Sequence, residues 1–194
     1  MEGKKRLSGL KLALKTSVVS GMTLLSRILG LVRDIVFARF FGAGLLMDAF
    51  LVAQRIPNML RRFFAEGAFS AGFVPVMARY KERHGPEEAR EYVGAMAGTF
   101  GVVLFVVTLI GVIGAPVLVL MVAPGFVGDG GDFELAALML RFTFPYLFFV
   151  SLTAFAGGVL NTYGRFGVPA FTPVLLNVVL IAAAVWAAPL LEQP

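Results

Sequence analysis

The chain has 194 residues, of which 58% are apolar and 15% are charged, and its formal net charge is +5. This mixture is too apolar for an ordinary soluble domain and indicates an integral membrane protein. The basic excess lies mostly in segments that flank apolar stretches, so it gives no reason to expect nucleic-acid binding.

Two stretches of membrane-spanning length come first in the chain, at 18–41 and 46–64. A helix needs roughly 20 residues to cross about 30 Å of hydrocarbon. Both stretches carry charges, which are costly inside a bilayer and persist mainly where they meet a partner, a watery cavity or a charged substrate. The charged residues in or beside these stretches are Arg27, Arg33, Asp34, Arg39, Asp48, Arg55, Arg61, Arg62 and Glu66. We therefore expect the first two spans to line a transport pathway.

Three further spans are predicted at 93–121, 137–160 and 169–189, because long uncharged runs occupy most of these stretches. The expected fold class is all-α: a polytopic transmembrane helix bundle of about five spanning helices, forming a single membrane domain over 1–194. Connecting segments are expected at 79–91 and 123–134.

Local patterns predict where the helices begin, bend and pack. Pro86 is followed by acidic residues, a combination typical of a helix start. Pro57 and Pro145 predict kinks, and both a kink beside a substrate site and a purely structural kink fit them. Gly111 and Gly114 predict close approach of helices, which we interpret as bundle packing.

The distribution of Lys and Arg predicts the orientation. Basic residues precede the first span, lie within 79–91 and occur at Arg165, whereas 123–134 contains three acids and no Lys or Arg. Since Lys and Arg are retained on the cytoplasmic side, we expect a cytoplasmic N-terminus, a cytoplasmic 79–91 segment and a periplasmic 123–134 loop. Arg39 and Arg141 lie near span ends on the other side and are exceptions. No cleaved signal is expected.

The charges of the second span share one side of an ideal helix. Asp48, Arg55, Arg62 and Glu66 have offsets of 0, 7, 14 and 18 residues. At about 100° per residue, these offsets project within roughly 40° of one line. The pattern predicts a polar stripe along the helix.

Ion pairing accounts for only part of this charge. Arg27 and Asp34 are seven residues apart on the first span, and Arg62 and Glu66 are four apart on the second, so each pair shares a helix face. However, six arginines stand against three acids in the two spans. The planar fork of arginine suits phosphate and carboxylate groups, so we favour an anionic-ligand pathway over pairing or snorkelling alone.

No catalytic motif is found, so no enzyme activity is expected. The absence of cysteine excludes disulfides, thiolate metal sites and cysteine nucleophiles. His84 lies in the polar 79–91 segment, where a solvated surface position is the favoured interpretation. A membrane glycosyltransferase remains a weak alternative, whose only carboxylate candidates are Asp129, Asp132 and Glu134. No cofactor or metal is predicted.

The charged residues belong to four longer motifs: SRILGLVRDIVFARFFGAG, MDAF, RIPNMLRRFFAEGAFSAGFVPVMARY and LNTYGRFGVPAFTPVLLN. These motifs resemble the N-terminal part of the bacterial lipid II flippase family (MurJ, also called MviN), within the multidrug, oligosaccharidyl-lipid and polysaccharide exporter superfamily. The resemblance begins at about Ser17 and extends to the end of the chain.

The resemblance implies transport of lipid II by alternating access across the bacterial cytoplasmic (inner) membrane, for cell wall synthesis. Lipid II is undecaprenyl pyrophosphate carrying a disaccharide-pentapeptide. The resemblance implies a substrate-binding role for Arg27, Arg33 and Arg61, to which the neighbouring Arg62 is added. It also implies that Asp34, Asp48 and Glu66 form ion pairs that gate the cavity.

The resemblance implies a protein with fourteen helices in two lobes, and this chain matches part of the N-terminal lobe. We therefore expect it to work with the missing C-terminal portion of the transporter and with membrane lipids. A related exporter of lipid-linked polysaccharide and a nontransporting structural membrane protein remain alternatives. An exporter of cationic drugs is disfavoured because the arginines would repel cations.

Overall fold

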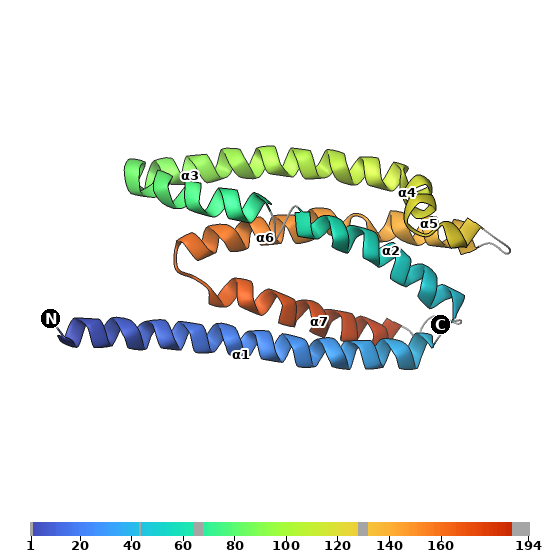
Figure 1. The fold of residues 1–194 in the computed structure, drawn as a ribbon, viewed down its shortest axis with the longest axis horizontal. Helices are drawn as coiled ribbons and strands as arrows, with labels where there is room; N and C mark the ends of the chain where they lie inside the picture. Colours follow the sequence, from blue (N-terminus) through green and yellow to red (C-terminus); the bar gives the residue numbers. More distant parts are fainter. Residues whose placement is uncertain (1, 43, 64–67, 128–131, 188–194) are drawn as a thin grey trace. The chain divides into compact units, whose positions relative to one another are not determined.

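The computed structural model describes residues 2–42, 44–63, 68–127 and 132–187, and the regular elements in these ranges are all helices (Figure 1). The predicted all-α class is confirmed. The helices form two compact units. We call them the α1/α7 unit, within 1–42 and 163–194, and the α2–α6 unit, within 43–162.

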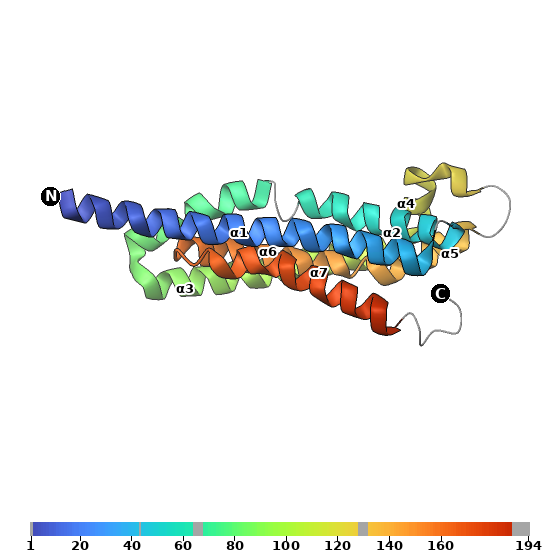
Figure 2. The same ribbon diagram turned by 90° about the horizontal axis from the view of Figure 1, so that it is seen from below.

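The α1/α7 unit pairs the first helix with the last. Helix α1 covers Glu2–Phe41 and α7 covers Gly167–Ala187, and the two lie side by side and run in the same direction (Figures 1 and 2). Helix α1 begins well before the predicted span at 18–41, because residues 2–17 are mostly good helix formers without proline. It ends at Gly42, whose φ of 64° lies in the left-handed region and whose N–H donates to the Ala38 carbonyl oxygen at 3.1 Å.

Helices α2 to α6 and a short 3-10 helix make up the second unit. Their bounds are Leu45–Arg61 for α2, Ala68–Ile113 for α3, Ala115–Val122 for α4, Pro124–Val127 for the 3-10 helix, Asp132–Thr143 for α5 and Tyr146–Thr162 for α6. One face of α2, with Ala49, Ala53 and Ile56, is buried against α4, α5 and the start of α6. The Thr143 hydroxyl adds a hydrogen bond to the Ala53 carbonyl oxygen at 3.1 Å.

Helix α3 is a helical hairpin whose two arms fold back on each other (Figure 1). The reversal occurs at Gly85, whose φ of 85° suits glycine and is unfavourable for other residues. Pro86 begins the second arm, as its sequence pattern predicts. The expected connecting segment 79–91 is therefore helical on both sides of one turn. A second core joins both arms to α6 through Phe73, Met77, Ala89, Phe100, Leu104 and Phe155.

Two predicted spans are divided by breaks in the helix. The stretch 93–121 is interrupted at Gly114, which separates α3 from α4, and 137–160 is interrupted at Phe144 and Pro145, which separate α5 from α6. These breaks meet in space, because the buried Phe144 ring packs directly over Gly111. In the described residues, three helical stretches are long and apolar enough to cross a membrane: Gly72–Ile113, Phe133–Thr162 and Gly167–Trp186. The count of five spans stays a prediction.

Candidate functional site

In the α1/α7 unit, a buried amide joins the two helices. Asn177 of α7 is only 6% exposed, and its Nδ2 donates to the Ser26 carbonyl oxygen of α1 at 3.0 Å. Ser26, Gly30 and Arg33 lie at intervals of four and three residues and so share one face of α1. A methyl group built on Gly30 would lie 3.9 Å from Asn177 Nδ2, in ordinary van der Waals contact, so Gly30 lies directly beside the amide.

The same amide orients Arg33. Arg33 Nη1 donates to Asn177 Oδ1 at 3.1 Å, while its Nε and Nη2 donate to Asp34 Oδ1 at 3.0 and 2.7 Å. Neighbouring residues on a helix do not normally face each other, but the long arginine side chain reaches back to Asp34. The Arg33 side chain is 27% exposed and that of Asp34 is 65% exposed. The guanidinium is thus held between two acceptors while part of it remains open.

Arg27 differs from Arg33 in having no hydrogen bond or ion pair within the described part of the chain. It is exposed on α1. The pairing of Arg27 with Asp34 that their spacing allows is not formed, and Asp34 instead pairs with Arg33. The α1/α7 unit therefore presents one fixed arginine and one exposed arginine whose charge is not neutralised locally.

Helix α2 carries the remaining predicted site residues. Asp48, Arg55 and Arg62 are exposed, whereas Ala49, Ala53 and Ile56 on another side are buried, so the predicted sidedness of the stripe is confirmed for these three charges. The fourth member, Glu66, lies outside the described residues. Arg61 ends α2 and is half-buried. The site residues are thus divided between the units, with Arg27, Arg33 and Asp34 in one and Asp48, Arg61 and Arg62 in the other.

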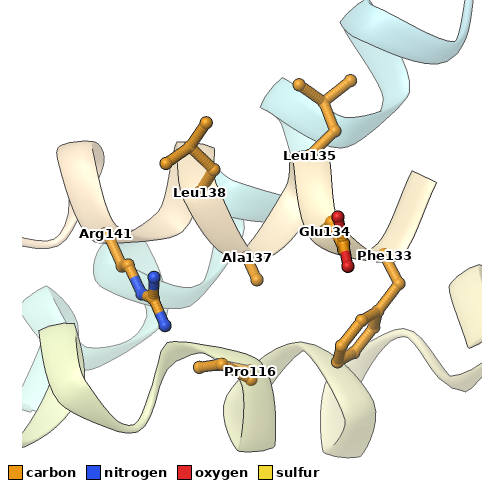
Figure 3. A pocket seen from close by; sticks show the side chains of 7 residues that line it. All are labelled: Pro116, Phe133, Glu134, Leu135, Ala137, Leu138 and Arg141. Carbon is orange, nitrogen blue, oxygen red and sulfur yellow. The ribbon is translucent and has the colours of Figure 1, made fainter. Parts of the chain in front are cut away.

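A pocket of about 620 Å³ lies between α4 and α5 in the α2–α6 unit (Figure 3). Its lining residues are Pro116, Phe133, Glu134, Leu135, Ala137, Leu138 and Arg141. Three carboxylates were candidates for a glycosyltransferase, and one of them, Glu134, lines this pocket. Asp129 and the side chain of Asp132 lie outside the part of the chain that the structure describes. The described lining therefore offers a single carboxylate, which falls short of an acid and base pair.

His84 has a local role near the hairpin turn of α3. Its ring is exposed and stacks on Tyr80 with 4.3 Å between centroids. Tyr80 in turn stacks on Tyr92 of the second arm at 4.7 Å. These contacts tie the two arms together close to Gly85.

Sequence reasoning missed Asn177 and Ser26 as parts of the site. The available signal was the position of Asn177 within a long uncharged run, since an amide at membrane depth usually seeks a hydrogen bond on a neighbouring helix. Its partners follow from how α7 is rotated against α1, which the sequence pattern does not specify.

The chain is similar to proteins named as lipid II flippases. The family model described as lipid II flippase MurJ matches residues 37–194. The chain is 52% identical over 176 residues to the lipid II flippase MurJ of Burkholderia cenocepacia, covering 91% of this chain and 34% of that protein. It is 50% identical over 180 residues to a Haemophilus influenzae protein named probable lipid II flippase MurJ, covering 89% of this chain and 35% of that protein.

The fold agrees with the sequence comparison. A solved structure of lipid II flippase MurJ in an inward closed conformation matches with a TM-score of 0.72 and 31% identity, covering 87% of this chain and 35% of that one. The chain thus spans about a third of the length of the relatives that it matches.

Proposed function

The chain belongs to the MurJ lipid II flippase family, since the family model matches most of its length, and we propose that it forms part of a transporter that flips lipid II across the bacterial inner membrane. The relatives named as flippases are about three times as long as the matched segment. Transport by alternating access then requires the rest of such a transporter, which supplies the remainder of this lobe and the second lobe that moves against it.

The observation that carries the proposal is the arginine arrangement of α1. A pyrophosphate headgroup is expensive to place in hydrocarbon, and charge-assisted hydrogen bonds from arginine offset that cost. Arg33 is held in one orientation by Asp34 and Asn177, so little side-chain entropy is lost when it binds a headgroup. Arg27 lies six residues earlier, exposed and without a local counter-charge.

The acids act as exchangeable partners in this mechanism. Both hydrogen bonds from Arg33 to Asp34 converge on one carboxylate oxygen, and the carboxylate is largely exposed. Such a pair is worth only about 0 to 1 kcal/mol, so a doubly charged headgroup displaces it readily. Asp34 pairs with Arg33 in the absence of substrate, and the ion pair forms again when the substrate is released. Asp48 and Glu66 are the other two acids that we assign to ion pairing and gating. Glu66 follows Arg62 by four residues, whereas Asp48 lies about 20 Å from Arg61 along α2 and therefore pairs with a different arginine.

The orientation follows from the charge distribution. The N-terminus and the turn at Gly85 face the cytoplasm, where the basic residues of 79–91 are retained, and the 123–134 loop faces the periplasm. The headgroup enters from the cytoplasmic side, where lipid II is assembled, and leaves toward the periplasm, where cell wall synthesis consumes it.

Single arginine variants in a complete transporter containing this segment test the proposal. We expect Arg27→Ala, Arg33→Ala and Arg61→Ala each to abolish lipid II translocation in membrane vesicles while membrane insertion stays normal. Arg33→Lys should retain part of the activity, because lysine keeps the charge and loses the fork. Arg39→Ala is the matched control, since Arg39 is an exposed arginine of the same helix with no assigned role. Full activity of all three alanine variants would leave charge pairing as the better account.

A further inference from the structure

The pocket between α4 and α5 contains a basic residue to which the proposed transport mechanism assigns no role. Arg141 is an exception to the rule that basic residues stay on the cytoplasmic side, and it lines this pocket together with Glu134. The two residues are seven positions apart on α5 and therefore share a face, about 10.5 Å apart along the axis. In Figure 3 both side chains extend toward the pocket, with Ala137 between them.

The two opposite charges do not neutralise each other. Within the described residues, neither Glu134 nor Arg141 makes a hydrogen bond or an ion pair. Between them the pocket wall is small and apolar, formed by Ala137 and by Pro116 of α4. A site of this kind suits a ligand that carries a negative and a positive group a few ångströms apart. A simple anion would be repelled by Glu134, and a simple cation by Arg141.

The surroundings indicate that the ligand is a lipid. Leu138 lines the pocket and is 47% exposed, and Phe142, next to Arg141, is 78% exposed. The helical stretch Phe133–Thr162 is long and apolar enough to span a membrane, so the pocket lies at one end of a predicted span. Acyl chains can cover these side chains while the headgroup stays in the pocket.

We propose that this pocket binds the headgroup of a phosphoethanolamine lipid, with the phosphate on Arg141 and the ammonium group on Glu134. A primary ammonium donates charge-assisted hydrogen bonds to a carboxylate, which the trimethylammonium of a choline lipid cannot do. Choline groups are instead bound by several aromatic rings, and the described lining contains only Phe133. The inference is independent of lipid II transport.

Lipid titration of the purified, delipidated chain tests this site, with bound lipid counted by native mass spectrometry. The wild type should bind palmitoyl-oleoyl phosphatidylethanolamine more tightly than the matching phosphatidylglycerol or phosphatidylcholine. Arg141→Gln should weaken binding of phosphatidylethanolamine and phosphatidylglycerol by about tenfold, the loss of one charge-assisted hydrogen bond. Glu134→Gln should weaken phosphatidylethanolamine to a similar extent and leave phosphatidylglycerol binding equal or tighter.

Arg39→Gln is the matched control and should leave lipid binding unchanged. Circular dichroism shows whether each variant keeps its helical content, and the lipid preference of the wild type tests the proposal even where a variant does not fold. Equal affinity of the wild type for the three lipids would overturn the proposal, and so would unchanged phosphatidylethanolamine binding in both variants. Glycerophosphoethanolamine, which has no acyl chains, should bind far more weakly; equal binding would rule out a membrane lipid as the source.

Discussion

One amide links the proposed headgroup arginine to the neighbouring helix. Asn177 uses its Nδ2 to bind the backbone of α1 at Ser26 and its Oδ1 to bind Arg33. Because both ends of one planar group are engaged, the rotation of α7 against α1 and the orientation of the guanidinium are coupled. Hydrogen bonds between membrane helices contribute about 0.6 kcal/mol on average and up to about 1.7 kcal/mol.

Replacing this amide should loosen the helix pair. We expect Asn177→Leu to lower the free energy of unfolding in detergent by about 1 to 2 kcal/mol, since the interhelical hydrogen bonds to Ser26 and Arg33 are lost and a larger side chain meets Gly30. Thr172→Val is the control on the same helix, because the Thr172 hydroxyl bonds only to the Val168 carbonyl oxygen of α7 itself, at 3.2 Å. Equal stability of the Asn177 and Thr172 variants would show that the amide does not hold the helices together.

At the scale of elements, two helix breaks set the directions in which helices of the α2–α6 unit run and pack. Gly114 ends α3 so that α4 can start in a new direction, and Phe144 lies in the break between α5 and α6. The Phe144 ring is almost fully buried and occupies the space over Gly111 that any side chain would need. The Phe144 ring thus packs the α5/α6 break closely against the end of α3.

A methyl group at this contact should be destabilising. We expect Gly111→Ala to lower the free energy of unfolding by about 1 to 3 kcal/mol, because the added carbon overlaps the Phe144 ring and forces α3 and the α5/α6 break apart. Gly101→Ala on the same helix is the control, since nothing lies within 4 Å of its added methyl group. That variant should be neutral or more stable by up to about 1 kcal/mol, the difference in helix propensity. Destabilisation of similar size at both positions would contradict the contact as its cause.

The elements also show what the sequence predicts and what it does not. The turn before Pro86 and the polar side of α2 follow from local patterns, and the structure confirms both. Pro57 and Pro145 carry the same local signal but differ in outcome, because Pro57 stays buried inside α2 whereas Pro145 lies between α5 and α6. Tertiary packing decides such cases. The break at Gly114 lies in a uniformly apolar run, where hydropathy does not show that the helix changes direction. Asn177 also lies in an apolar run, where hydropathy does not show which helix its side chain faces.

At the scale of the whole molecule, the positions of the connecting segments support a single sidedness for the α2–α6 unit. The turn of the α3 hairpin and the 3-10 helix after α4 lie at opposite ends of this unit (Figure 1). The first is flanked by basic residues, whereas the charged residues of the segment 128–134, which follows the second, are all acidic. The positions of these two segments thus agree with the orientation predicted from the Lys and Arg distribution, which was inferred without the structure.

Cysteine labelling in whole cells measures this sidedness directly. We expect Glu87→Cys to react only with reagents that reach the cytoplasm, and Gly125→Cys to react with an impermeant reagent added outside. Both positions are exposed, and neither has the positive φ that makes Gly85 unsuitable for substitution. The chain has no native cysteine, so the unsubstituted protein is the background control. Labelling of position 87 from outside would reverse the proposed orientation.

Helix α1 extends well beyond the length that a membrane span needs. Its 40 residues extend for about 60 Å, twice the thickness of the hydrocarbon layer. The part before the predicted span measures about 24 Å, so a tilt of about 10° around residue 18 would displace the start of the helix by about 4 Å. Arg33 lies about 22 Å from residue 18 on the other side, so the same tilt would displace it by about 4 Å in the opposite direction. A spin label near Lys4, outside the predicted span, would therefore move about as far as Arg33 does and would report the tilt of α1 during a transport cycle without altering the proposed headgroup site.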